Sequence, residues 1–315
     1  MRNTCLNMVH KLAKRDSRVV FVGSDLSPGL LAEMKQEMPQ RYYMEGVSEA
    51  NVVGMAAGLA MDGYVPYVNT IATFITRRCY EQVAVDLCLH NLPVRLIGNG
   101  GGLVYAPLGP THLAIEDLAI MRALPNMAVI AVADAPEMIR AMECTLDWPG
   151  PIYIRLAKGG DPVISRPELG FTIGKAIPLR LARASRPVVL MATGIMTGHC
   201  LEAARLLAGE GIDATVLHFH TFKPLDEAMV REHAASASLI VTVEEGVSIG
   251  GFGSAVTDVV TAHGRSAPPM LRLALPDAFP HKYGVQKDLL ELYGLMPDQI
   301  ATSVARAIGV PELVS

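Results

Sequence analysis

The sequence has few cysteines, no run of like charges and no long apolar stretch. Its five cysteines are Cys5, Cys79, Cys88, Cys144 and Cys200. They form no CxxC pair or metal-ligand spacing, so we expect reduced, packed thiols. A net charge of −4 excludes the basic footprint of nucleic-acid-binding proteins. No apolar run approaches the ~20 residues that span a bilayer, and residues 1–16 lack the apolar core of a signal peptide. We therefore expect a cytoplasmic protein that acts on small molecules.

Length and pattern favour an α/β protein. The chain has 315 residues and is 50% hydrophobic, enough for two domains of roughly 150 residues. Short β-branched runs alternate with helical segments, which is typical of βα units on a parallel sheet. The predicted strands are 18–25, 65–72, 94–99, 127–134, 151–156, 187–195, 214–220 and 238–246. The predicted helices are 48–63, 76–90, 113–125, 135–146, 197–210 and one after Lys223-Pro224.

The alternation stops between the two sets of strands. Residues 161–186 are rich in glycine, proline and scattered charge and show no sustained period, which indicates a linker. We predict an α/β fold of two doubly wound domains with mostly parallel sheets. The first domain is 1–160 and the second is 187–315.

Glu49 is the first candidate for chemistry. It opens an otherwise small and apolar helix that contains Gly54 and Gly58, a face against which a planar ligand could lie. An acid at the start of a helix is also favoured by the helix dipole alone. The residues by themselves leave both interpretations open.

The segment 98–112, GNGGGLVYAPLGPTH, is the second candidate. A loop of this length inside a compact domain is usually functional or disordered. It ends at His112, which could bind a ligand or simply cap or pack. Its three successive glycines match neither common phosphate-binding spacing, so they are weak evidence for a phosphate cradle.

Other candidates have a structural alternative. Phe74 follows a strand and would be a core residue by default, and Arg77 and Arg78 would be solvated or paired. His218 and His220 alternate along a strand and share a face, but no third ligand lies nearby in the sequence, so we expect a structural role.

Several motifs together resemble a known family. They are GVSEANVVGMAAGLA, TRRCYEQV, GPTHLAIEDLAIMRALPN, FKPLD and VEEGVSIGGFGSAV. In the same order and spacing they resemble the C-terminal half of transketolases and deoxyxylulose-phosphate synthases, which use thiamine diphosphate. The resemblance covers nearly the whole chain. It implies a pyrimidine-binding domain followed by a transketolase C-terminal domain.

The resemblance also implies roles for individual residues. Glu49 would be catalytic and would hydrogen-bond N1′ of the cofactor's aminopyrimidine ring, against which Phe74 would pack. A carboxyl group in an apolar pocket can share a proton with a ring nitrogen. Arg77 would belong to the cofactor-binding set. His112 would contact substrate and take part in catalysis, and Arg155 would lie near a substrate phosphate.

Two features depart from the family pattern. Full-length relatives bind Mg²⁺ and the cofactor diphosphate through a GDG motif followed by Asn, and no GDG occurs here. We therefore expect no metal ligands in this chain, and a partner subunit carrying that motif. In the substrate loop, Gly100 replaces a histidine and Leu108 replaces an aspartate, which removes an acceptor for a sugar hydroxyl.

These features predict the β-type subunit of a split, transketolase-like enzyme that moves a two-carbon ketol or acyl unit. It would be active only with its partner, in a two-plus-two heterotetramer in which two copies of this chain pair. Its substrate would be a sugar phosphate or a 2-oxoacid. Acyl transfer, as in deoxyxylulose-phosphate synthase or a 2-oxoacid dehydrogenase β chain, is the alternative. A non-catalytic regulatory subunit is a third possibility, which Glu49, Phe74 and His112 oppose.

Overall fold

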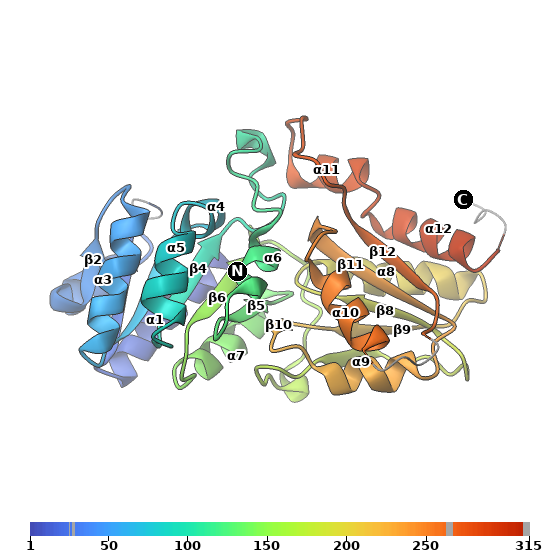
Figure 1. The fold of residues 1–315 in the computed structure, drawn as a ribbon, viewed down its shortest axis with the longest axis horizontal. Coiled ribbons are helices and arrows are strands. Elements are labelled where there is room, and N and C mark those ends of the chain that lie inside the picture. The colour runs from blue at the N-terminus through green and yellow to red at the C-terminus, as the bar shows by residue number, and fades with distance from the viewer. Residues whose placement is uncertain (25, 27–28, 263–266, 311–315) are drawn as a thin grey trace.

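The computed structural model describes residues 1–24, 26, 29–262 and 267–310. It contains two β-sheets that lie side by side, each covered by helices (Figure 1). The chain forms the first sheet with its N-terminal half and the second with its C-terminal half, apart from one exchanged strand. Every helix in the described part of the chain is too short or too polar to cross a membrane.

The first sheet has seven strands within the described residues, in the order β10-β5-β6-β4-β3-β1-β2. Six come from the N-terminal half and run parallel to their neighbours: β1 (Val19–Gly23), β2 (Tyr42–Met44), β3 (Val65–Ile71), β4 (Arg95–Asn99), β5 (Ala128–Ala131) and β6 (Ile152–Leu156). The seventh, β10 (Thr221–Lys223), comes from the C-terminal half and pairs antiparallel with β5. The two halves of the chain therefore share a sheet.

Helices cover both faces of this sheet. The helical segments of the first half are α1 (Arg2–Arg15), α2 (Ala32–Glu37), η1 (Pro39–Arg41), α3 (Glu49–Met61), α4 (Ala72–Thr76), α5 (Tyr80–Gln82), the π-helix η2 (Val83–Cys88), η3 (Ala106–Leu108), α6 (Asp117–Ala123) and α7 (Ala135–Thr145). Side chains alternate along β1, so that Phe21 packs with α1 and α7 while Val22 packs with α3.

The second sheet has the order β12-β11-β8-β9-β7. Its strands are β7 (Ile177–Arg180), β8 (Val188–Ala192), β9 (Ala214–His218), β11 (Leu239–Val247) and β12 (Met270–Leu275). The helices of this half are η4 (Pro167–Leu169), α8 (Met196–Gly209), α9 (Glu227–Ala234), α10 (Phe252–Thr261), α11 (Gln286–Leu292) and α12 (Pro297–Ala307). All pairs are parallel except β7 with β9.

The predicted class of two α/β units with mostly parallel sheets is confirmed. The expected strands and helices are present, most with shorter bounds and two, β11 and α8, shifted by one residue. Residue 25, the end of the first predicted strand, lies outside the described residues. The expected linker, 161–186, contains η4 and β7, which belongs to the second sheet. The domain limits 1–160 and 187–315 stay a prediction.

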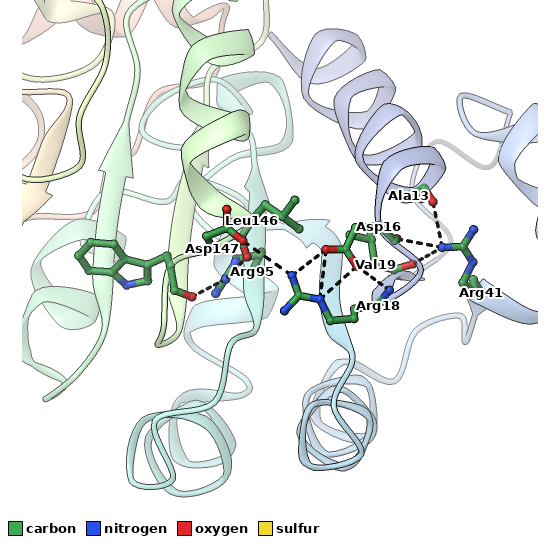
Figure 2. Close-up of polar contacts among 9 residues, drawn as sticks. Ala13, Asp16, Arg18, Val19, Arg41, Arg95, Leu146 and Asp147 are labelled. Carbon is green, nitrogen blue, oxygen red and sulfur yellow. Dashed lines mark hydrogen bonds and ion pairs between the residues drawn. The ribbon is translucent and has the colours of Figure 1, made fainter.

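Buried arginines tie the strand starts of the first sheet to the elements around them. Arg95 of β4 is fully buried and donates to the carbonyls of Leu146, Trp148 and Gly150 at 3.2, 2.6 and 2.6 Å. Figure 2 shows Arg95 together with Arg41, which donates to the Ala13 carbonyl at 2.9 Å. Burial lowers the pKa of Arg95 to about 10, so it keeps its charge at neutral pH. These contacts close the edge of the sheet opposite the strand ends where ligands usually bind.

A buried acid joins the two halves near β9. Glu137 of α7 contacts His218 Nε2 through Oε2 at 2.9 Å, and His218 Nδ1 contacts Thr197 Oγ1 of α8 at 2.7 Å. Glu137 and His218 are almost completely buried. His220 lies beside this pair and stacks on Phe171 with ring centroids 3.9 Å apart. Both histidines therefore have the expected structural role.

Replacement of Glu137 should lower the free energy of unfolding, by an amount that depends on pH. Burial raises the pKa of Glu137, but His218 and further hydrogen bonds outweigh it and lower the pKa to about 2. Because the folded pKa is depressed, the stabilisation is present above pH ~4.5 and is lost as pH falls toward 2. We predict that Glu137→Gln lowers the free energy of unfolding by about 1–3 kcal/mol at pH 7.

Urea unfolding between pH 7 and 3 measures this difference, which should shrink below pH 5. Glu143→Gln is the matched control, because Glu143 lies on the same helix but pairs with Arg15 at the exposed surface. It should change stability by less than about 0.5 kcal/mol. An equal effect of the two substitutions, or no pH dependence, would contradict the account.

Candidate functional site

The candidate site lies at the carboxyl edge of the first sheet. Ile71 of β3 pairs in register with Asn99 of β4, and Asn99 pairs with Leu156 of β6. The segments that follow these strands therefore leave the sheet side by side. They are α4, the loop that ends at His112, and the segment after β6. Ligands of open α/β sheets bind at this edge.

Glu49 is buried at the start of α3. Its side chain is 5% exposed, and the inward face of the helix consists of small or β-branched residues such as Val52 and Ala56. Glu49 Oε2 accepts a hydrogen bond from Arg78 Nη1 at 3.1 Å. The buried carboxylate is therefore paired with a half-exposed guanidinium.

Arg78 also contacts Phe74. Its Cζ atom lies 3.8 Å from the centroid of the Phe74 ring, within the range of a cation–π contact. Its side chain is 48% exposed. A planar group with N–H donors thus covers the aromatic ring and reaches the Glu49 carboxylate at the same time.

His112 completes this cluster. Its ring lies edge-on to Phe74, with centroids 5.2 Å apart, and 6.5 Å from the ring of Tyr105. Thr111 Oγ1 contacts its Nδ1 at 2.9 Å. Burial, and then the charge of Arg78, lower the pKa of His112. The imidazole is therefore neutral at pH 7 and can both donate and accept a hydrogen bond.

Arg77 points to the substrate loop and not to Glu49. It forms an ion pair with Glu116 and donates to the carbonyls of Pro110 and Leu113 at 3.2 and 2.8 Å. The ring of Phe279 lies 5.6 Å from its Cζ atom. The structure thus brings Glu49, Phe74 and His112 together around Arg78, while Arg77, which we expected in the cofactor-binding set, contacts the loop; its binding of cofactor stays a prediction.

Arg155 is anchored beneath the loop. Its Nε lies 3.1 Å from Asp117 Oδ2, and its Nη2 donates to the carbonyls of Ala114 and Glu245 at 2.8 and 2.7 Å. The side chain is 8% exposed. These partners belong to the same chain, so the geometry gives Arg155 a structural task, and its contact with a substrate phosphate stays a prediction.

Gly100 and Leu108 line one cavity of about 270 Å³. Arg2, Tyr105 and Lys158 line it too, so two cations face the space. Leu108 is half-exposed. Gly100 has a φ of +72°, and a Cβ atom there would collide with the Tyr105 ring. Glycine at this position therefore makes room for Tyr105.

Sequence reasoning missed four of these residues. The sequence could have indicated the contact of Arg78 with Phe74. Arg78 follows Phe74 by four residues, and residues four apart in a helical segment lie on the same face. Tyr105 belongs to the candidate segment 98–112, but its place beside His112 depends on how that loop folds. Arg2 and Lys158 had no signal, because they lie far from the loop in sequence and reach it only through the fold. Among the described residues, no three His, Cys, Asp or Glu side chains are grouped so that they could hold a metal ion.

Comparison with known proteins identifies both halves of the chain. Residues 1–160 match the family model of the transketolase pyrimidine-binding domain, and residues 179–300 match that of the transketolase C-terminal domain. The chain is 36% identical over 302 residues to a 6-deoxy-6-sulfo-D-fructose transketolase subunit from Clostridium sp. (strain MSTE9), covering 95% of this chain and 92% of that subunit. It is 38% identical over 305 residues to the 1-deoxy-D-xylulose-5-phosphate synthase of Thioalkalivibrio sulfidiphilus, covering 96% of this chain but only 46% of the synthase.

Solved structures agree. A split-gene transketolase described as an inactive beta4 tetramer superposes with a TM-score of 0.89 at 32% identity, covering 98% of both chains. A full transketolase from Campylobacter jejuni shares the fold with a TM-score of 0.80 at 19% identity, and the chain covers 45% of it. Together with the family models, these similarities show that the chain belongs to the transketolase family, with that family's pyrimidine-binding and C-terminal domains.

Proposed function

We propose that this chain is the β-type subunit of a split, thiamine-diphosphate-dependent enzyme that moves a two-carbon ketol unit between carbonyl substrates. The observation that carries the proposal is the cluster of Glu49, Phe74 and His112 at the carboxyl edge of the first sheet. The near-complete coverage of the Clostridium subunit and of the split-gene transketolase supports a subunit of this length.

The residues fit the aminopyrimidine end of thiamine diphosphate. Such a ring needs an acceptor for a ring N–H and an aromatic face on which to stack. Glu49 and Phe74 supply both, and the Arg78 guanidinium makes the same two contacts, with its nitrogen 3.1 Å from the carboxylate and its carbon 3.8 Å from the ring centroid. A planar N–H donor is thus compatible with the site, and Arg78 has to move aside for the cofactor.

The chain's own residues then have distinct tasks. Bound thiamine diphosphate supplies the nucleophilic carbon and the electron sink for breaking a carbon–carbon bond next to a carbonyl. Glu49 holds a proton at the ring nitrogen, and Phe74 fixes the plane of the ring. The neutral His112 donates a hydrogen bond to a substrate oxygen or accepts one from it.

The cavity beside this cluster favours a substrate with an anionic end. Arg2 and Lys158 line it together with Tyr105, and cations in a partly enclosed site attract phosphate, sulfonate or carboxylate groups. A sugar phosphate or sulfonate fits this arrangement. The second candidate function is acyl transfer from a 2-oxoacid, which Leu108 favours because it offers no acceptor for a sugar hydroxyl.

A partner subunit completes the proposed enzyme in the cytoplasm. It would bring the GDG motif and the Asn that hold Mg²⁺ and the diphosphate, both of which require oxygen ligands or N–H donors. The assembly would be a heterotetramer of two partners and two copies of this chain.

The proposed function predicts that the cofactor is bound tightly only when the partner subunit is present. The isolated chain should bind thiamine diphosphate with Mg²⁺ at least about 100-fold more weakly than the reconstituted complex, because only the pyrimidine end is held. Calorimetry on the chain alone and with its partner measures this. Tight, Mg²⁺-dependent binding by the chain alone would disprove the split enzyme.

The second prediction concerns Glu49. Glu49→Gln keeps the size and one acceptor oxygen but cannot exchange a proton with the ring, so turnover should fall about 10²–10⁴-fold. The exchange of the cofactor C2 proton with deuterium in the complex should slow, while the melting temperature stays within a few degrees.

Glu45→Gln is the control, because Glu45 is an exposed acid four residues earlier. It should leave exchange unchanged. If the cofactor C2 proton exchanged at the wild-type rate in Glu49→Gln, Glu49 would have no role in the chemistry and would only favour the start of the helix.

The third prediction concerns Leu108. Its half-exposed position means that Leu108→Asp does not bury a carboxylate, but the new charge would face Arg2 and Lys158 and repel an anionic substrate. We expect kcat/KM to fall about tenfold, or about 1.4 kcal/mol. Leu108→Asn introduces a side chain of the same size as Asp but without its charge. In this variant the logarithm of kcat/KM should fall by less than half as much as in Leu108→Asp.

Steady-state kinetics of the complex with ketose phosphates and with 2-oxoacids measures both variants and selects between the two candidate functions. Equal kinetics of Asp and Asn variants would show that the cavity does not bind an anion.

A further inference from the structure

Three successive glycines begin the substrate loop, and each one is required by a different neighbour. A Cβ atom at Gly100 would collide with Tyr105, one at Gly101 with Arg155, and one at Gly102 with Glu245. Gly102 also has a φ of +63°, which favours glycine. The loop backbone at Gly102 therefore lies closer to the Glu245 carboxylate, in the second half of the chain, than it could if residue 102 had a side chain.

Glu245 lies on β11 and holds the start of the loop. Its Oε1 accepts a hydrogen bond from the Leu103 backbone N–H at 2.9 Å and another from Gln286 Nε2 of α11 at 2.7 Å. The residue is 4% exposed. Burial raises the pKa of the Glu245 carboxyl, against the opposing effect of Arg155 and of these two hydrogen bonds. Removal of the carboxyl would leave the buried Leu103 N–H without its acceptor, which costs more than the hydrogen bond itself contributes.

The same strand also holds the end of the loop. Val247 N donates to the Ile115 carbonyl at 2.8 Å, and the Glu245 carbonyl accepts from Arg155 at 2.7 Å. Gly102 and Ala114 exchange two backbone hydrogen bonds, at 2.9 and 3.0 Å, which closes the loop at its base. Both ends of the loop are thus fixed against β11, and the residues between them include Leu108 and His112.

The second half also covers the loop tip. A Cβ atom at Gly109 would lie 2.6 Å from the ring of Tyr283, in the segment before α11. Figure 1 shows this segment beside the loop above the sheets. Gln286, the first residue of α11, connects this cover to Glu245.

We propose that Glu245 is a positioning residue for the chemistry at His112, through its hydrogen bonds to the loop backbone at Leu103 and to Gln286. The inference rests on the proposed function for the role of His112. Glu245 does not touch the Glu49 cluster, and its effect is transmitted by the backbone of residues 101–115. The second domain in this way sets the shape of a site to which the first domain supplies the reacting side chains.

The neighbouring acid is a matched control. Glu244 is also buried on β11, but its carboxylate accepts from the backbone N–H groups of Phe252 and Gly253 at the start of α10, at 2.7 and 2.9 Å. Glu244 and Glu245 thus make similar bonds on opposite faces of one strand. Glu245→Met and Glu244→Met each remove one buried acceptor, and Glu245→Gln keeps an acceptor oxygen.

Hydrogen exchange on the reconstituted complex tests the contact without any activity. Residues 101–115 should exchange about tenfold or more faster in Glu245→Met and return close to wild type in Glu245→Gln. In Glu244→Met the faster exchange should appear in 252–261 instead. Unchanged exchange of 101–115 in Glu245→Met would overturn the proposal.

Kinetics tests the role in positioning. Glu245→Met should lower kcat/KM about 10–100-fold, with KM of the anionic substrate raised at least about fivefold, because the loop forms a wall of the cavity. A purely structural loss would reduce the active fraction and leave KM unchanged, as expected for Glu244→Met. Equal KM values in Glu244→Met and Glu245→Met, or no rescue by Glu245→Gln, would overturn the proposal. An inactive wild-type complex would contradict the proposed function, whereas hydrogen exchange would still decide whether Glu245 holds the loop.

Discussion

One buried arginine, Arg155, joins the main parts of this structure. It lies near the end of β6 in the first sheet, pairs with Asp117 at the start of α6 at 3.1 Å, and donates to the carbonyls of Ala114 and of Glu245 on β11. Burial of a guanidinium costs several kcal/mol unless charges and carbonyls surround it. Burial lowers the pKa of Arg155, but Asp117 and Glu245 outweigh it and raise the pKa, so the group stays charged. Arg155 thus links the loop, α6 and the second sheet. Loss of any one of these contacts would leave a buried charge only partly compensated.

This arrangement explains why the two domains act together. The first domain carries Glu49, Phe74 and His112, and the contacts of these side chains among the described residues are with Arg78, Tyr105 and Thr111 of the same domain. Its β11 nevertheless lies against the base of the loop, β10 pairs with β5, and Glu137 reaches His218 across the junction. Each contact lies at or below the carboxyl edge of the first sheet. The second domain therefore restrains the base of the loop, and Arg78 on the other side of the cluster remains half-exposed.

The sequence predicted those parts of the fold that depend on local pattern. β-branched runs revealed the central strands, because buried parallel strands are continuously apolar. β10 and β7 were missed because they are three and four residues long and are defined by long-range pairing. α1 was missed although Cys5, Val9 and Leu12 show helical spacing and are buried. Glu49, Phe74 and His112 stood out as candidates in the sequence, and the resemblance gave each of them an expected role. Glu245 lies in one of the motifs that carry the resemblance, but its contact with the loop, like the place of Lys158 in the cavity, depends on tertiary structure that no local pattern encodes.

In the proposed function, thiamine diphosphate would occupy the place that Arg78 fills in this structure. A cation–π contact at a half-exposed site contributes about 0.5–1 kcal/mol, and an ion pair that solvent reaches contributes about 0–1 kcal/mol. Moving Arg78 aside therefore costs about 0.5–2 kcal/mol, or a factor of about 2–30 in affinity. That cost is small beside the contacts that a partner's diphosphate and metal site would add. The same contact keeps Glu49 paired and the Phe74 ring covered in the chain by itself, so neither group is left without a partner before the proposed cofactor binds.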